Sequence, residues 1–354
     1  MRSRVSPSLL ASQALFDQGK WEECSRECAS VFRQAPSDRE IRKLYTLSLL
    51  RGREPEFAGA APREILAFLQ SVLALGYVDE EIQRLYLHHL EAHLREDLGR
   101  KERERPGELI LGIGPGRCGS TSLSRALHEL PDAYVTHECR PLVDWEPEPR
   151  QIAFHCARLR LLSRYFGLVG DVSHWWGNKL SEVKAGTGLP LKVIHLKRDP
   201  LACSRSFLLV KRLGKGAVNH WVVHDGSYWS SNLWDACYPG VPVSPHGNEA
   251  EREISFEQLH RREPAPVHFE ALSALSSHAL DSLHFQAIRR YVGAYNGLEI
   301  HSVVGEENGI EIAMERMHEP DSGDRLGRFL GRTIARVPHR NEKSIADSEG
   351  EIPF

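Results

Sequence analysis

The sequence predicts an α/β fold, a parallel β-sheet flanked by helices, preceded by an all-helical region. Two apolar runs of strand length, at residues 109–113 and 193–196, are each followed by a turn and a run at helical spacing. Before them, apolar residues recur at helical spacing through the first hundred positions. We therefore expect a helical domain at 1–100, a linker at 101–107 and an α/β domain at 108–354.

Composition narrows the class of protein. The chain has 354 residues and a net charge of −3, so no basic field for nucleic acid is expected. It contains no apolar run of about 18 residues, and its basic N-terminus lacks the apolar core of a signal peptide. Its seven cysteines show no framework or metal-ligand spacing. We expect a cytoplasmic protein without a membrane span and without a metal.

The helical region begins with a predicted hairpin at residues 8–36, which Pro36 ends. Further helices are predicted at 41–50, 62–75 and 79–97. The hairpin resembles a tetratricopeptide repeat at Gly19, Trp21, Cys24, Val31 and Pro36. Two roles remain open for this region. It docks a partner or a protein acceptor, or it caps the α/β domain.

The centre of the α/β domain is the glycine-rich turn at 114–119, between a strand and a helix start. Glycines allow backbone N–H groups to converge on an anion, and the helix N-terminus adds partial positive charge. Arg117 adds a planar fork of donors for phosphate or sulfate oxygens. Gly114 and Gly119 have Walker A spacing, but Ser120 stands where that motif has lysine. An ordinary ATP or GTP site is therefore disfavoured.

Residues 191–206 form a second candidate anion-binding segment. A strand ends in Arg198, Pro200 starts a helix, and Ser206 follows eight positions after the arginine. Together, the Arg-Cys-Gly-Ser-Thr-Ser turn and this Arg-Asp-Pro segment resemble the two cofactor motifs of sulfotransferases. That family uses 3′-phosphoadenosine 5′-phosphosulfate (PAPS) as co-substrate and requires no metal. The resemblance implies a P-loop-type sheet, the sulfotransferase fold, over residues 108–345.

The resemblance also implies which residues hold PAPS. Arg117 is expected to hold the phosphosulfate, and Arg198 and Ser206 the 3′-phosphate. A basic tail segment is expected to close over the phosphates. The full expected set is Gly116, Arg117, Cys118, Gly119, Ser120, Thr121, Ser122, Arg198, Ser206, Arg340 and Lys343.

Sulfuryl transfer needs a base for the proton of the acceptor hydroxyl. Glu138 follows a predicted strand at 134–136, and the surrounding stretch is similar to tyrosylprotein sulfotransferases. His174 follows another strand end and is the alternative base. Arg117 completes the expected catalytic set by stabilising the leaving phosphate. Expected acceptor contacts are His137, Arg140, Asp171, Ser173 and Trp175.

The remaining segments are less specific. Residues 211–270 are an irregular insertion, either an acceptor-binding loop or a decoration. Residues 298–304 alternate apolar and polar positions, which predicts a strand, and a later helix is expected to end at Gly331. His195 is expected to be a core residue.

The acceptor is a hydroxyl compound: a peptide tyrosine, a sugar or a small metabolite. Two rival functions remain open. One is a P-loop phosphotransferase that uses ATP and Mg²⁺, against which the missing lysine argues. The other is a non-catalytic helical scaffold with a degenerate nucleotide fold.

Overall fold

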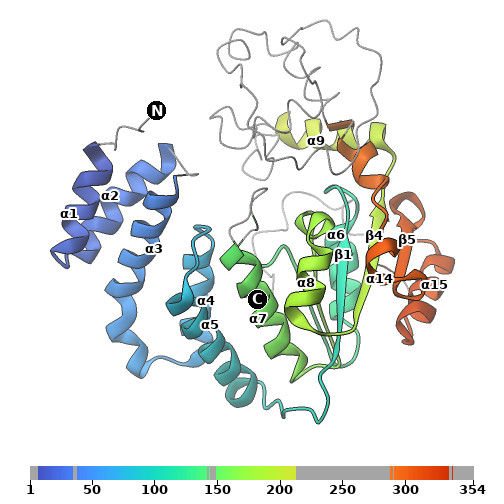
Figure 1. The fold of residues 1–354 in the computed structure, drawn as a ribbon, viewed down its shortest axis with the longest axis horizontal. Helices are drawn as coiled ribbons and strands as arrows, with labels where there is room; N and C mark the ends of the chain where they lie inside the picture. Colours follow the sequence, from blue (N-terminus) through green and yellow to red (C-terminus); the bar gives the residue numbers. More distant parts are fainter. Residues whose placement is uncertain are drawn as a thin grey trace, which may run out of the picture. The chain divides into compact units, whose positions relative to one another are not determined.

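A computed structural model describes residues 7–34, 38–141, 143, 149–212, 288–289, 291–334 and 337 (Figure 1). The chain divides into two compact units. The first comprises residues 1–106 and 139–165 with the last three residues, and the second comprises 107–138 and 166–351. Residues 139–165, which the sequence analysis placed in the second domain, therefore group with the helical unit.

The first unit is helical, as its apolar spacing predicts. Its early helices are α1 (Pro7–Asp17), α2 (Trp21–Gln34) and α3 (Arg39–Arg53), followed by the 3₁₀ turn η1 (Glu54–Gly59). Then come α4 (Pro62–Leu73), α5 (Glu80–Ala92) and the π-type turn η2 (His93–Asp97). The later segment adds α7 (Pro149–Ser163). The likeness to tetratricopeptide repeats stays a prediction.

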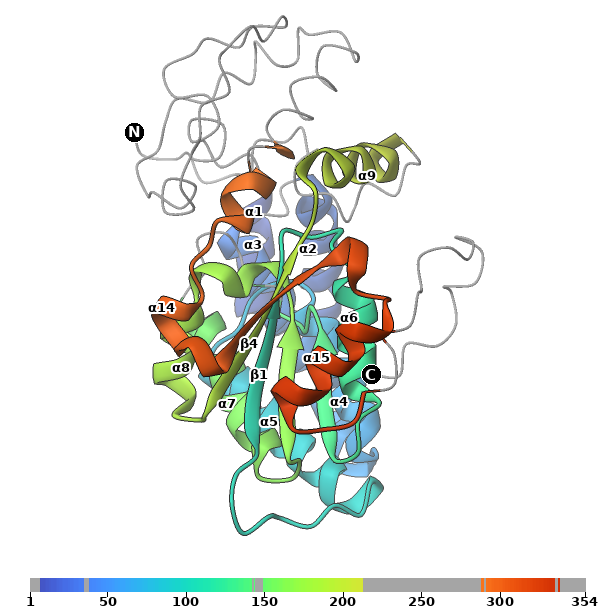
Figure 2. The same cartoon turned by 90° about the vertical axis from the view of Figure 1, so that its right-hand side faces the viewer.

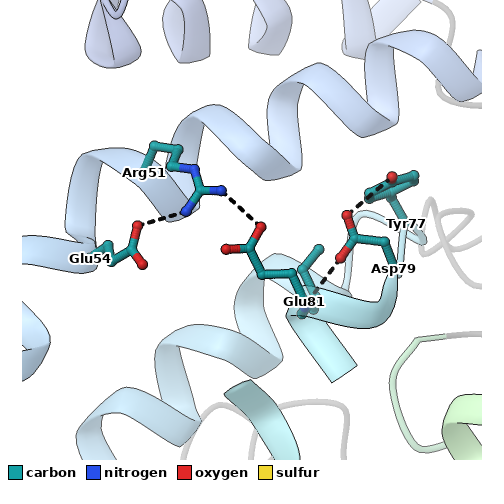
Figure 3. A network of polar contacts seen from close by, with 6 residues as sticks. Arg51, Glu54, Tyr77, Asp79 and Glu81 are labelled. Carbon is teal, nitrogen blue, oxygen red and sulfur yellow. Dashed lines mark hydrogen bonds and ion pairs between the residues drawn. The ribbon is translucent and has the colours of Figure 1, made fainter. Parts of the chain in front are cut away.

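Polar side chains join the helices of this unit (Figure 3). The Arg51 guanidinium forms ion pairs of 2.8 Å with Glu54 and with Glu81 of α5. Asp79 caps α5 by accepting the Ile82 N–H at 2.9 Å. Arg51 is one-third exposed, so the pairs contribute only about 1 kcal/mol each. The Arg51–Glu81 pair links α3 to α5, whereas the Arg51–Glu54 pair lies within the turn that ends α3.

The second unit is built on a five-stranded parallel sheet. The strands are β1 (Glu108–Ile113), β2 (Ala133–His137), β3 (Leu168–Val172), β4 (Leu191–Lys197) and β5 (Gly309–Ala313). Their order is β2-β3-β1-β4-β5, and every neighbouring pair is parallel. The sequence-based prediction of a parallel sheet flanked by helices is confirmed. Apolar strands such as β1 are buried on both faces, as parallel strands require.

Helices cover both faces of the sheet (Figure 2). On one side lie α6 (Ser120–His128) and α15 (Pro320–Leu330), whose apolar residues share one buried cluster with the strands. On the other lie η3 (His174–Asn178), α8 (Leu180–Thr187) and α14 (His301–Val304). α9 (Pro200–Arg212) follows β4, and the short turns η5 (Glu306–Asn308) and η6 (Met314–Arg316) flank β5. Gly331 ends α15 in a left-handed cap, as predicted.

The strand expected at 298–304 is wrong. His301–Val304 is helical, and the fifth strand is Gly309–Ala313. Ile300 and Val304 are both buried and lie four positions apart, which is the spacing of one helix face. The short alternation therefore fitted either period, and packing against β4 selected the helix.

Candidate active site

The topology of the sheet indicates where a ligand site is expected, at the carboxyl ends of β1 and β4. The connection after β1 runs toward β2, whereas the connection after β4 runs to β5 on the opposite side. In parallel α/β sheets, ligands bind outside the carboxyl ends of the strands at such a switch point. β1 and β4 are direct neighbours, so the two predicted anion-binding segments emerge side by side.

The turn after β1 is tightly folded. Gly116, Arg117 and Gly119 have φ values of +82°, +51° and +84°, and left-handed backbone is costly for a non-glycine residue such as arginine. A Cβ atom on Gly114 would lie 2.4 Å from Cys118 Sγ, so only glycine fits there. Gly119 precedes α6, and no side chain caps that helix within the described residues. The first N–H groups of α6 can therefore donate hydrogen bonds to an anion.

The two arginines meet, although 81 positions separate them. Arg198 Nη1 donates a hydrogen bond to the main-chain carbonyl of Arg117, and Arg117 Nε donates to Ser206 Oγ at 3.3 Å. Burial, and then the neighbouring charge of Arg198, lower the pKa of Arg117. Within the described residues, neither guanidinium forms an ion pair with a carboxylate. Two half-buried positive charges without a counter-ion favour an anionic ligand.

The two candidate bases also meet. Glu138 follows β2 and His174 follows β3, and these strands are neighbours in the sheet. His174 Nδ1 lies 3.3 Å from Glu138 Oε1. Glu138 has a φ of +50°, a strained backbone of the kind found at functional sites. An ionised carboxylate only accepts hydrogen bonds, so it can accept from Nδ1 when that ring nitrogen carries the proton.

The His137 side chain contacts the start of α6, after the glycine-rich turn. Its Nε2 atom is 2.9 Å from Ser120 Oγ, at the first residue of α6. Ser120, the residue in place of the Walker lysine, is thereby oriented by a histidine from β2. The acceptor contact expected for His137 stays a prediction, and its partner in the structure is Ser120.

Three of the predicted acceptor contacts are buried. Asp171 is fully buried, accepting hydrogen bonds from Thr136 Oγ1 at 2.6 Å and Trp176 Nε1 at 2.8 Å. Ser173 and Trp175 are 1% and 6% exposed. Their contact with an acceptor stays a prediction, and in the structure these side chains belong to the packed end of β3.

The remaining predicted donor contacts differ in exposure. Thr121 is exposed, but Cys118 and Ser122 are buried, so they offer the ligand main chain rather than side chain. Burial raises the pKa of the Cys118 thiol to about 11, which keeps it protonated. Arg140 belongs to the helical unit and stays a prediction. Arg340, Lys343 and residues 213–270 lie outside the described residues.

Two residues that the sequence analysis did not single out form hydrogen bonds with the main chain of candidate site residues. Asn296 forms two hydrogen bonds with the main chain of Arg198, and the Tyr295 hydroxyl donates to the main-chain carbonyl of His174 at 2.6 Å. Both act on backbone atoms, for which no sequence motif exists.

Comparison with known proteins yields one structural match and no family. No protein-family model matches the chain, and no curated protein matches it significantly. A sulfotransferase structure from Alicyclobacillus acidocaldarius matches with 17% identity and a TM-score of 0.35, covering 69% of this chain and 88% of that one. Both values are too low to assign a function.

The described residues contain neither a membrane-spanning helix nor a metal-binding cluster. In the described part of the chain, no helix combines the length and apolarity needed to cross a membrane. The same residues contain no cluster of three or more histidine, cysteine or acidic side chains arranged to hold a metal ion.

Proposed function

We propose that this protein is a sulfotransferase that moves a sulfuryl group from PAPS to an acceptor hydroxyl. The observation that carries the proposal is the convergence of Arg117 and Arg198 without a carboxylate partner in the described residues. A ligand with two anionic groups would pair with both arginines, since each guanidinium can bind phosphate or sulfate oxygens through two parallel N–H donors. The Ser120 position lacks the lysine that ATP-hydrolysing loops use.

The residues present suit PAPS. Arg117 and the first N–H groups of α6 would hold the phosphosulfate, and Arg198 with Ser206 would hold the 3′-phosphate. When bound, PAPS supplies the activated sulfuryl group and a nucleotide leaving group. Fixed donors at the leaving side stabilise negative charge without reorganising, which is the main electrostatic source of rate enhancement.

The Glu138–His174 pair would take the proton of the acceptor hydroxyl. The lone pair on His174 Nε2 accepts the proton, while Glu138 holds Nδ1–H and balances the charge that develops on the ring. Glu138 Oε1 already lies within hydrogen-bonding distance of His174 Nδ1, which favours His174 as the group that takes the proton. Glu138 then acts as its orienting partner.

The acceptor class follows less directly. A peptide tyrosine, a sugar and a small metabolite all present a hydroxyl to such a pair. We further propose that the helical unit docks a protein or peptide acceptor. Replacing the exposed charged side chains of that unit would then lower the transfer of sulfate to peptide acceptors more than the transfer to small acceptors.

Transfer of radiolabelled sulfate from PAPS to a panel of acceptors tests the function. The panel comprises tyrosine peptides, sugars and small phenols, each assayed with the wild type and with Arg117→Ala. We expect labelled product from at least one class, and at least a tenfold loss in the variant. Labelled phosphate transfer from ATP in place of sulfate transfer would favour a phosphotransferase instead.

A further inference from the structure

The helical residues 291–296 end in two consecutive side chains that contact opposite halves of the site. Asn296 contacts the arginine on the donor side, and Tyr295 contacts the histidine on the acceptor side. No residue of this turn was among the predicted site residues. The two contacts differ in kind from ordinary packing, because each one fixes main-chain atoms of a proposed functional residue.

Asn296 holds Arg198 on both sides of its Cα atom. Its Nδ2 donates to the Arg198 carbonyl at 2.8 Å, and its Oδ1 accepts from the Arg198 N–H at 3.4 Å. Arg198 is the first residue after β4, where strand pairing no longer fixes the backbone. The amide thus continues the strand's hydrogen bonding by one residue, which aims the guanidinium at the turn after β1.

Tyr295 holds His174 in the same manner. Its hydroxyl donates to the His174 carbonyl at 2.6 Å, a short and well-formed hydrogen bond. The phenol ring is fully buried against His195 and Tyr291, with ring centroids 5.9 and 5.6 Å away. The ring cannot shift without disturbing the core, so the position of the His174 backbone is set by a rigid group.

We propose that Tyr295 and Asn296 are positioning residues that hold the donor arginine and the acceptor-side histidine at a fixed mutual distance. This rests on the proposed function, since it assigns these halves to one reaction. Adjacent residues of one helical turn move together, so Arg198 and His174 share a common support. In-line transfer requires such registration, because small misplacements of reacting groups cost large factors in rate.

The test uses two variants with different expected effects in the full-length protein. Asn296→Ala should weaken binding of 3′-phosphoadenosine 5′-phosphate (PAP), measured by calorimetry, by about threefold to tenfold. Its turnover at saturating PAPS should also fall, because a misplaced Arg198 shifts the donor relative to His174. Tyr295→Phe should leave PAP affinity unchanged but lower the rate of PAPS hydrolysis, with water as acceptor, by a similar factor or more. PAP binding needs no acceptor, so donor-side effects are read independently of activity.

Two matched controls remove comparable hydrogen bonds elsewhere. Asn308→Ala deletes an amide that donates to the Val304 carbonyl at 3.1 Å. Tyr165→Phe deletes a phenol hydroxyl that donates to Glu91 at 2.7 Å in the helical unit. Both should leave PAP affinity and hydrolysis unchanged. Thermal unfolding of all four variants shows whether any of them is merely destabilised.

Loss of PAP affinity in Asn296→Ala alone, together with loss of turnover in both variants, supports the proposal. Losses of affinity and turnover in both variants that only follow the loss of thermal stability would overturn it and leave a purely structural role. Wild-type affinity in Asn296→Ala would also overturn it. If the wild type itself binds no PAP, the proposed function fails first and the positioning role fails with it.

Discussion

His174 Nδ1 lies 3.3 Å from Glu138 Oε1, although the two residues follow different strands of the sheet. Under the proposed function, this contact makes the two alternative bases one acid–base unit. When Nδ1 carries the proton it donates to the carboxylate, and the lone pair of the ring then lies on Nε2. The two residues should therefore act together, and their removal should not be additive.

We expect His174→Ala to lower PAPS turnover by a factor of about 10² to 10⁴, the usual contribution of general-base catalysis. Glu138→Ala should cost less, and the double variant should be no slower than His174→Ala alone. PAP affinity, measured by calorimetry, should stay at the wild-type level in all three. Additive losses in the double variant would show that the residues act independently.

The arginine pair should govern donor affinity. Arg117→Ala and Arg198→Ala should each weaken PAP binding at least tenfold, since each removes a charge-assisted contact worth about 1.5–3 kcal/mol. Lysine should restore only part of the affinity, because it lacks the planar fork. Arg205→Ala, an exposed arginine on α9, is the matched control and should bind PAP normally. Unchanged binding in Arg117→Ala would remove the turn from the site.

The glycine-rich turn should tolerate no side chain at its last position. An alanine at Gly119 would hold a left-handed backbone and place its Cβ 2.3 Å from Met317 Cε. We expect a loss of about 1–3 kcal/mol in stability and weaker PAP binding. Gly188→Ala is the control, because φ is +65° there but no atom lies within 4 Å of the added Cβ. It should lose only about 1 kcal/mol and keep its affinity.

His195 should make folding stability sensitive to acid. Burial, followed by the charge of Lys197, lowers its pKa to about 4. Between about pH 6.5 and 4 the unfolded chain therefore binds the proton more readily, so stability present above pH 6.5 is lost as the pH falls toward 4. The loss is at most about 3 kcal/mol. His195→Leu should flatten this part of the stability curve in urea titrations, and an unchanged slope would contradict the assignment.

The chemistry that the sequence predicted lies in contiguous segments. The turn at 114–119 and the Arg198 segment each follow a strand, so a linear pattern reveals both and only their meeting needs the fold. The pairing of Glu138 with His174 required the adjacency of β2 and β3, which no local pattern encodes. The roles of Tyr295 and Asn296 rest on main-chain contacts, and the buried state of Asp171 rests on packing. Tertiary context decided each of these.

We propose that Arg117 and Arg198 together bind one activated-sulfate nucleotide. Calorimetric titration of the wild-type protein with PAP, and separately with ATP and Mg²⁺, tests it most directly. We predict saturable PAP binding without metal, tighter than ATP binding and lost in the Arg117→Ala, Arg198→Ala double variant. Absence of PAP binding, or tighter binding of ATP with Mg²⁺, would contradict the claim.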